Sequence, residues 1–132
     1  IIDKPAGTQD ADVIDVQTPF DVHFEFYNGV EGQVVNLSLI LYTTAGVCVF
    51  NVTTPATKLS KGRHTSLLRI PGGLLNDDIY SIVVHMVKDA SVILHTVEDL
   101  LTFEVIDVKR GETGWFGKWM GAVRPTLEFT ID

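Results

Sequence analysis

The chain has 132 residues, of which 45% are apolar and 20% are charged. This length fits one domain with a substantial core, and the composition is that of a folded domain, not of a disordered tail. The formal net charge of −7 argues against general binding to nucleic acids or to anionic membranes. No apolar run approaches the ~18 residues that a membrane-spanning helix needs.

Residues 1–10 have the Pro, Gly and polar composition of a linker. The sequence starts at Ile1, without an initiator Met or a basic and then apolar leader. We therefore expect a fragment of a longer protein, in which residues 1–10 lead from an upstream domain into a single domain formed by residues 11–132.

After the linker, apolar residues recur at every second position, which is typical of strands with one buried face. The alternating sets are Phe20, Val22, Phe24 and Phe26; Val35, Leu37, Leu39 and Leu41; Tyr80, Ile82, Val84 and Met86; Leu101, Phe103 and Val105; and Leu127, Phe129 and Ile131. Turn signals such as Asn28-Gly29 and Pro71-Gly72-Gly73 separate them. About eight strands, each with one apolar face, predict an all-β antiparallel sandwich.

The segment 109–124 interrupts this rhythm with a long connection. It holds both tryptophans, four glycines, and four of the ten basic residues against one acid, a net charge of +3 that leaves −10 for the rest of the chain. Gly111 and Gly117-Lys118 come close to a phosphate-binding loop, but the spacing is one residue too long and Trp119 stands where Ser or Thr is required.

No motif predicts catalysis, a cofactor or a metal centre. The sequence lacks a GxSxG elbow and an HExxH motif, and its four histidines never occur at metal-ligand spacing. The single cysteine, Cys48, lies in an apolar run, and we expect it to be buried as a small hydrophobic residue. The domain is therefore predicted to bind a ligand without transforming it.

Two regions are candidates for that binding. The first is a strand face, and its expected residues are His23, Glu25 and Tyr27, with Asn36, Ser38 and Tyr42 joining them if the two strands pair. The second is the segment 109–124, where Trp115 and Trp119 can offer an aromatic surface to a sugar ring and Arg110 and Lys118 can meet an anionic group. The alternatives are that the strand face is merely solvated and that the tryptophans close one end of the core.

Several segments resemble the C-terminal domain of Wzt, the ATP-binding component of bacterial O-antigen polysaccharide exporters. They are Gln17-Thr18-Pro19-Phe20-Asp21-Val22, Ala45-Gly46-Val47-Cys48-Val49-Phe50, Ile70-Pro71-Gly72-Gly73-Leu74-Leu75-Asn76-Asp77-Asp78-Ile79-Tyr80-Ser81 and Gly121-Ala122-Val123-Arg124-Pro125. They occur in the family's order and together span most of residues 11–131. Asp77-Asp78 departs from the pattern, where a Gly is expected in the turn.

The resemblance implies an immunoglobulin-like sandwich that follows a nucleotide-binding domain at the cytoplasmic face of the inner membrane of a Gram-negative bacterium. It implies binding of completed O-polysaccharide, in some cases through a modified non-reducing end, and contact with the membrane subunit of the transporter. It also implies a homodimer that exchanges a terminal strand, for which the apolar strand at 127–131 is the candidate. A structural dimerisation module without glycan contact and an accessory domain of a glycan-modifying enzyme remain alternatives.

Overall fold

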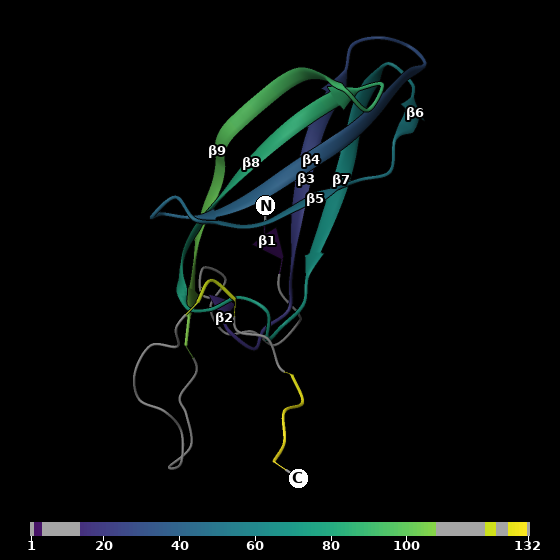
Figure 1. Cartoon of the computed structure of the whole chain (residues 1–132). Coiled ribbons are helices and arrows are strands. Elements are labelled where there is room, and N and C mark those ends of the chain that lie inside the picture. The colour runs from purple at the N-terminus through teal and green to yellow at the C-terminus, as the bar shows by residue number, and fades with distance from the viewer. Residues whose placement is uncertain (1, 4–13, 108–120, 124–126, 132) are drawn as a thin grey trace.

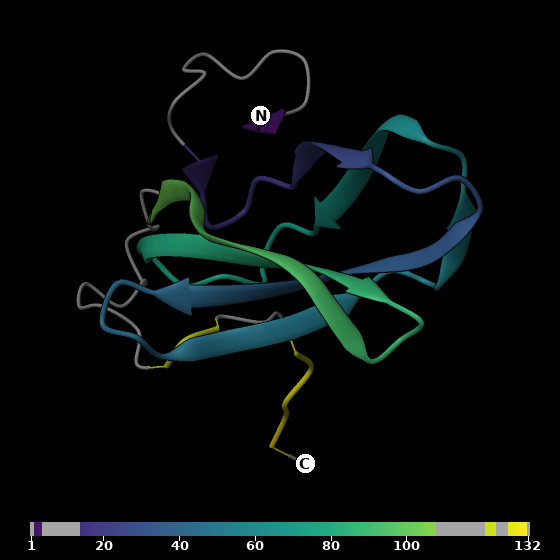
Figure 2. The same cartoon turned by 90° about the horizontal axis from the view of Figure 1, so that it is seen from above.

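The computed structural model describes residues 2–3, 14–107, 121–123 and 127–131. Nine strands are found in these residues, arranged in two sheets (Figures 1 and 2). The smaller sheet contains β1 (Ile2–Asp3), β3 (Phe20–Asn28) and β7 (Gly62–Ile70) in the order β1-β3-β7. All of its pairs are antiparallel.

The larger sheet has six strands in the order β2-β9-β8-β4-β5, with β6 also paired to β4. Their bounds are Ile14–Asp15 for β2, Gln33–Thr43 for β4, Cys48–Thr53 for β5, Thr57–Leu59 for β6, Asp78–Lys88 for β8 and Val92–Ile106 for β9. Its pairs are antiparallel except for β2 and β9, which run parallel.

The core lies between the two sheets, where the alternating apolar side chains predicted from the sequence meet. Strand β4 shows this most clearly, since Val35, Leu37, Leu39 and Leu41 are all buried while the residues between them are half-buried. The residues buried around them include Phe20, Val22, Ile70, Leu75, Tyr80, Ile82, Phe103 and Val105. The predicted all-β sandwich and the inward faces of four of the five alternating windows are confirmed.

Four details differ from the expectation. The parallel pairing of β2 means that the sandwich is not purely antiparallel. Residues 2 and 3, expected in the linker, pair with β3. Cys48 is exposed, because it begins the edge strand β5 beside the turn at Gly46. Residues 127–131 alternate between apolar and polar residues as a strand does. In the described structure, however, they pair with no other strand and form no strand themselves.

A buried tyrosine ties the C-terminal part of the chain to the sandwich. The Tyr80 hydroxyl donates to the carbonyl oxygen of Asn76 at 2.6 Å and lies 3.3 Å from that of Ala122. The Asn76 side-chain amide donates to the Gly121 carbonyl at 2.7 Å, and Leu75 forms a bridge with Val123. Residues 121–123 are therefore held against the turn that precedes β8.

The same turn also approaches the segment before β3 at very short range. The Gly73 amide donates to the Val16 carbonyl at 2.7 Å. A Cβ on Gly72 would lie 2.0 Å from the carbonyl oxygen of Gln17 and 2.8 Å from its carbonyl carbon. Both atoms belong to the backbone, so only glycine fits here without moving one of the two segments.

We expect Tyr80→Phe to lower the free energy of unfolding by about 1–2 kcal/mol at neutral pH, because buried carbonyl groups lose their donor. Burial raises the pKa of Tyr80 from its ordinary value of 10.0 to about 12, and the carboxylates of Asp78 and Asp77 add to the rise. The unfolded chain therefore releases this proton first, and stability present below pH 10 is lost between about pH 10 and 12. Urea unfolding of both proteins across this pH range should show that the free energy of unfolding falls more steeply with pH in the wild type than in Tyr80→Phe. Equal slopes would contradict a raised pKa for Tyr80.

The close approach of Gly72 gives a second stability test. Gly72→Ala should cost at least 2 kcal/mol, because the added methyl group overlaps backbone atoms that can move only with their whole segment. Gly29→Ala is the matched control, since a Cβ there meets nothing within 4 Å. Thermal unfolding of the two variants should separate them clearly, and similar melting temperatures would show that the segments can part at little cost.

Candidate functional site

The outer face of the larger sheet carries a row of polar side chains. Register places Ser38 directly opposite Thr53 on β5 and His85 on β8, and His85 lies opposite Thr96 on β9. Cross-strand partners point to the same side of a sheet, so these residues form one row across four strands. The Ser38 hydroxyl donates to the side-chain oxygen of Asn51 at 3.1 Å, and a ring nitrogen of His85 lies 2.8 Å from the Thr96 hydroxyl.

A hollow of about 380 Å³ opens on the same face, two rows away. Tyr42 lies opposite Ser81 on β8, and Ser81 lies opposite Thr102 on β9. The hollow is lined by Tyr42, Thr43, Thr44, Gly46, Ser81, Val83, Glu98, Asp99 and Thr102. An aromatic ring, several hydroxyl groups and two carboxylates thus surround one shallow depression, which we call the Tyr42 hollow.

The sequence predicted Tyr42 as a binding residue but missed the residues around it. Ser81 and Thr102 were identifiable as outward positions of alternating strands, yet nothing in the sequence showed that they lie beside Tyr42. Glu98 and Asp99 reach the hollow because β9 departs from regular pairing there. Asn36 lies on this face too, opposite Val87, but six residues along β4 from Tyr42, which is roughly 20 Å.

The predicted residues His23, Glu25 and Tyr27 project from the outer face of the smaller sheet, as expected. All three are exposed, and they lie opposite Leu67, Thr65 and Arg63 of β7. The expected junction with Asn36, Ser38 and Tyr42 does not exist, because β3 pairs with β1 and β7 while β4 belongs to the other sheet. The two sets therefore lie on opposite outer faces of the sandwich.

His23 and Glu25 also line a groove of about 630 Å³ at the open side between β3 and β9. Strand β1 pairs only with residues 21 and 22 of β3, and β2 pairs only with residues 105 and 106 of β9. Beyond these short pairings, no described strand covers the edges of β3 and β9 that border the groove. Leu100 and Leu101 form the wall across from His23 and Glu25.

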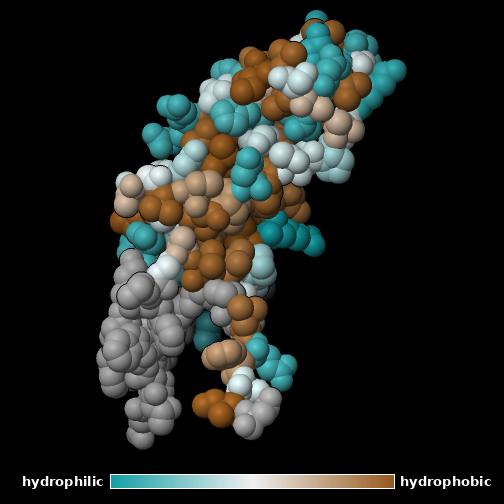
Figure 3. All heavy atoms as spheres, viewed as in Figure 1, coloured by the Kyte–Doolittle hydropathy of each residue, from teal (hydrophilic) through white to brown (hydrophobic). Residues whose placement is uncertain are grey.

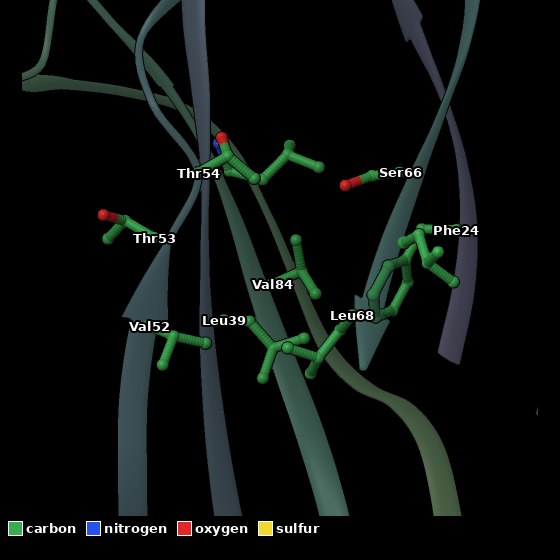
Figure 4. Close-up of a pocket in the computed structure, with 10 residues that line it drawn as sticks. Phe24, Leu39, Val52, Thr53, Thr54, Ser66, Leu68 and Val84 are labelled. Atoms are coloured by element: carbon green, nitrogen blue, oxygen red, sulfur yellow. The ribbon is translucent and has the colours of Figure 1, made fainter. Parts of the chain in front are cut away.

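A smaller cavity of about 150 Å³ lies at the other open side, between β5 and β7 (Figure 4). Phe24 and Leu68 of the smaller sheet point toward Leu39 and Val84 of the larger one. Thr53, Thr54 and Ser66 also line the cavity, although the Thr53 hydroxyl points away from it. The walls are thus mainly apolar, which suits an apolar side chain better than a sugar.

Arg110, Trp115, Lys118 and Trp119 lie outside the described residues, so the segment 109–124 stays a prediction as a binding region. Within the described ranges, no group of three or more His, Cys, Asp and Glu residues is placed to hold a metal ion. The described part of the chain also contains no helix that is long and apolar enough to cross a membrane.

Comparison with known proteins supports the fold. No protein-family model and no curated protein matches the sequence. The crystal structure of the C-terminal domain of Wzt matches with a TM-score of 0.74 and 13% identity, covering 99% of this chain and 80% of that one. The chain has the fold of the Wzt C-terminal domain. The resemblance that the sequence segments indicated is confirmed at this level.

A second solved structure, a putative beta-galactosidase from Bacteroides fragilis, matches with a TM-score of 0.50 and 16% identity. The match covers 80% of this chain but only 15% of the galactosidase chain. A sandwich of this kind therefore also occurs as a small part of a much larger protein.

Proposed function

We propose that this domain binds a polysaccharide without transforming it, through the outer face of the larger sheet and with the Tyr42 hollow at the centre of the site. The observation that carries this proposal is the lining of the hollow, which combines one aromatic ring with hydroxyl and carboxylate groups on an open sheet face.

The chemistry of a sugar ring explains why this lining matters. One side of the ring carries C–H groups that pack on an aromatic face, while its rim carries hydroxyls that need hydrogen-bond partners. Tyr42 offers the first kind of contact, and Ser81 and Thr102 offer the second. The row of Ser38, His85 and Thr96 offers a second polar strip on the same face, separated from the hollow by the apolar pair Ile40 and Val83, so a polymer can make several weak contacts at once.

The fold supports a more specific setting. Because the Wzt C-terminal domain shares this fold, we infer that the bound polymer is O-polysaccharide and that the domain follows the nucleotide-binding domain of an exporter. In that setting it acts at the cytoplasmic face of the inner membrane, next to the transporter's membrane subunit, and couples completion of the glycan to export. A modified chain end would occupy the segment 109–124, whose Trp115, Trp119, Arg110 and Lys118 suit an anionic cap.

The C-terminal segment supports a second role, homodimer formation by strand exchange. Leu127, Phe129 and Ile131 are 76%, 97% and 101% exposed. The segment projects from the end of the domain where β2 lies (Figures 1 and 3). A second copy can bury these side chains by adding the segment to one of its sheet edges. The edge strands β5 and β7 flank the apolar cavity of Figure 4, and this cavity offers room for one of the three apolar side chains.

Substitution of one tyrosine on each sheet tests where polysaccharide binds. Tyr42→Ala should weaken binding by about tenfold, or 1–2 kcal/mol, with little change in melting temperature because the ring is only half-buried. Tyr27→Ala, on the smaller sheet, should leave the affinity unchanged. Binding is measured on an array of bacterial O-polysaccharides and then by calorimetry with the tightest neutral one. A loss with Tyr27→Ala alone would move the site to the smaller sheet.

The dimer is tested by the mass in solution. One chain weighs 14.6 kDa, so light scattering should report about twice that mass at micromolar concentration. Phe129→Asp should give the monomer, because burying an unpaired charge in a partner's core is costly. Glu128→Ala changes the neighbouring exposed position and should leave the dimer intact. If the wild-type protein is a monomer, the strand-exchange proposal is wrong. If the dimer persists in Phe129→Asp, the interface lies on another surface.

A further inference from the structure

The Tyr42 hollow is shaped by an irregularity in strand β9. Ile82 of β8 pairs with Leu101, whereas Val84 pairs with Val97, so Val83 alone faces the three residues 98–100. Asp99 has a φ of 49°, in the left-handed region that non-glycine residues rarely adopt. Bulges of this kind change the direction of side chains along a strand.

The consequence is that two acidic residues line the hollow from one short stretch. Glu98 and Asp99 are both exposed, and both line the depression with Tyr42, Ser81 and Thr102. An ionised carboxylate only accepts hydrogen bonds, and each of its oxygens can accept more than one. Sugar hydroxyls donate readily, and a carboxylate is a stronger acceptor than a neutral oxygen. The Ser81 and Thr102 hydroxyls can both donate and accept, which matches the remaining groups on a sugar rim.

Among the residues that the structure describes, the charged side chains that line the hollow are acidic, and no Lys, Arg or His lines it. An ion pair between Arg69 Nε and Asp21 Oδ1, at 3.8 Å, lies on the smaller sheet. Outside the segment 109–124, the chain carries a net charge of −10. A ligand carrying a carboxylate, phosphate or sulfate would meet two negative charges, with no basic side chain from the described residues in the lining to offset them.

We infer that the Tyr42 hollow is specific for uncharged sugar units with free hydroxyl groups, and that Glu98 and Asp99 exclude acidic sugar units. This inference rests on the proposed polysaccharide binding and adds the class of sugar that the site accepts. In this arrangement the carboxylates have two effects. They accept hydrogen bonds from a neutral sugar, and they repel an anionic one.

The test uses one polymer in three chemical forms. The probe is the tightest neutral polysaccharide from the array, then the same polymer after oxidation of its primary hydroxyls to carboxylates, then the oxidised polymer with these carboxylates converted to methyl esters. Wild-type protein in low salt should bind the oxidised form at least tenfold more weakly, and esterification should restore most of the affinity. Added salt should narrow the difference, because it screens charges at exposed sites.

The double variant Glu98→Gln/Asp99→Asn then identifies the groups responsible. It should bind the oxidised polymer about tenfold more tightly than wild type does, and the neutral polymer somewhat more weakly, because an amide oxygen is a poorer acceptor. Glu104→Gln is the matched control. It removes one negative charge from the same strand and lies five residues from Asp99, roughly 17 Å away. The two variants are compared at physiological salt as well as in low salt, because the screening length at physiological salt is only ~8 Å.

The outcomes separate this inference from the proposed function. If the wild type binds oxidised and neutral polymers equally, or if the double variant keeps the wild-type preference, the inference is wrong even where Tyr42→Ala weakens binding. If no polysaccharide binds, or if binding ignores Tyr42, the proposed function itself fails. A restored affinity for the oxidised polymer in Glu104→Gln would also overturn the inference, because the repulsion would then be general and not specific to the hollow.

Discussion

The contact among three aromatic rings is the interaction on which the rest of the domain depends. Tyr80 and Phe103 lie directly opposite each other on β8 and β9, with ring centroids 5.6 Å apart, and Phe20 of the smaller sheet meets Phe103 edge-on at 5.4 Å. These rings join the two sheets and bury a large apolar area. Because side chains alternate along a strand, fixing Tyr80 and Phe103 inward also fixes Ser81 and Thr102 outward. The polar site is thus a direct consequence of the core.

The inward faces of the main strands could be predicted because burial leaves a period-two pattern in the sequence. Val35 to Leu41 and Tyr80 to Ile82 are cases where alternation alone named buried residues correctly. Which strands pair with each other leaves no such pattern in the sequence. Nothing in the residues of β3 and β4 shows that the chain changes sheets at Asn28, although neighbouring strands often pair. The sequence therefore left open whether the two strands share a binding face, and the structure shows that they do not.

Two further features could not be settled from the sequence, for physical reasons. The segment 127–131 alternates like a strand, but a strand also needs a partner edge, and alternation does not say whether that edge belongs to the same molecule. The bulge in β9 could not be predicted, since 92–106 reads as one continuous strand with polar and apolar residues mixed. Glu98 and Asp99 acquire their place from a local shift in pairing, and this shift depends on how β8 and β9 twist together and not on either sequence alone.

The anchoring of residues 121–123 has a consequence for how such a domain can vary. The end of β9 is fixed by its pairing with β2 and β8, and the chain is held again at Val123 by the bridge to Leu75 and the contacts of Tyr80 and Asn76. Whatever lies between these two points begins and ends at set positions. In general, doubling the length of a flexible connection costs only about 0.6 kcal/mol. A change in the number of residues between 107 and 121 can therefore leave unchanged the point from which the C-terminal segment leaves the domain.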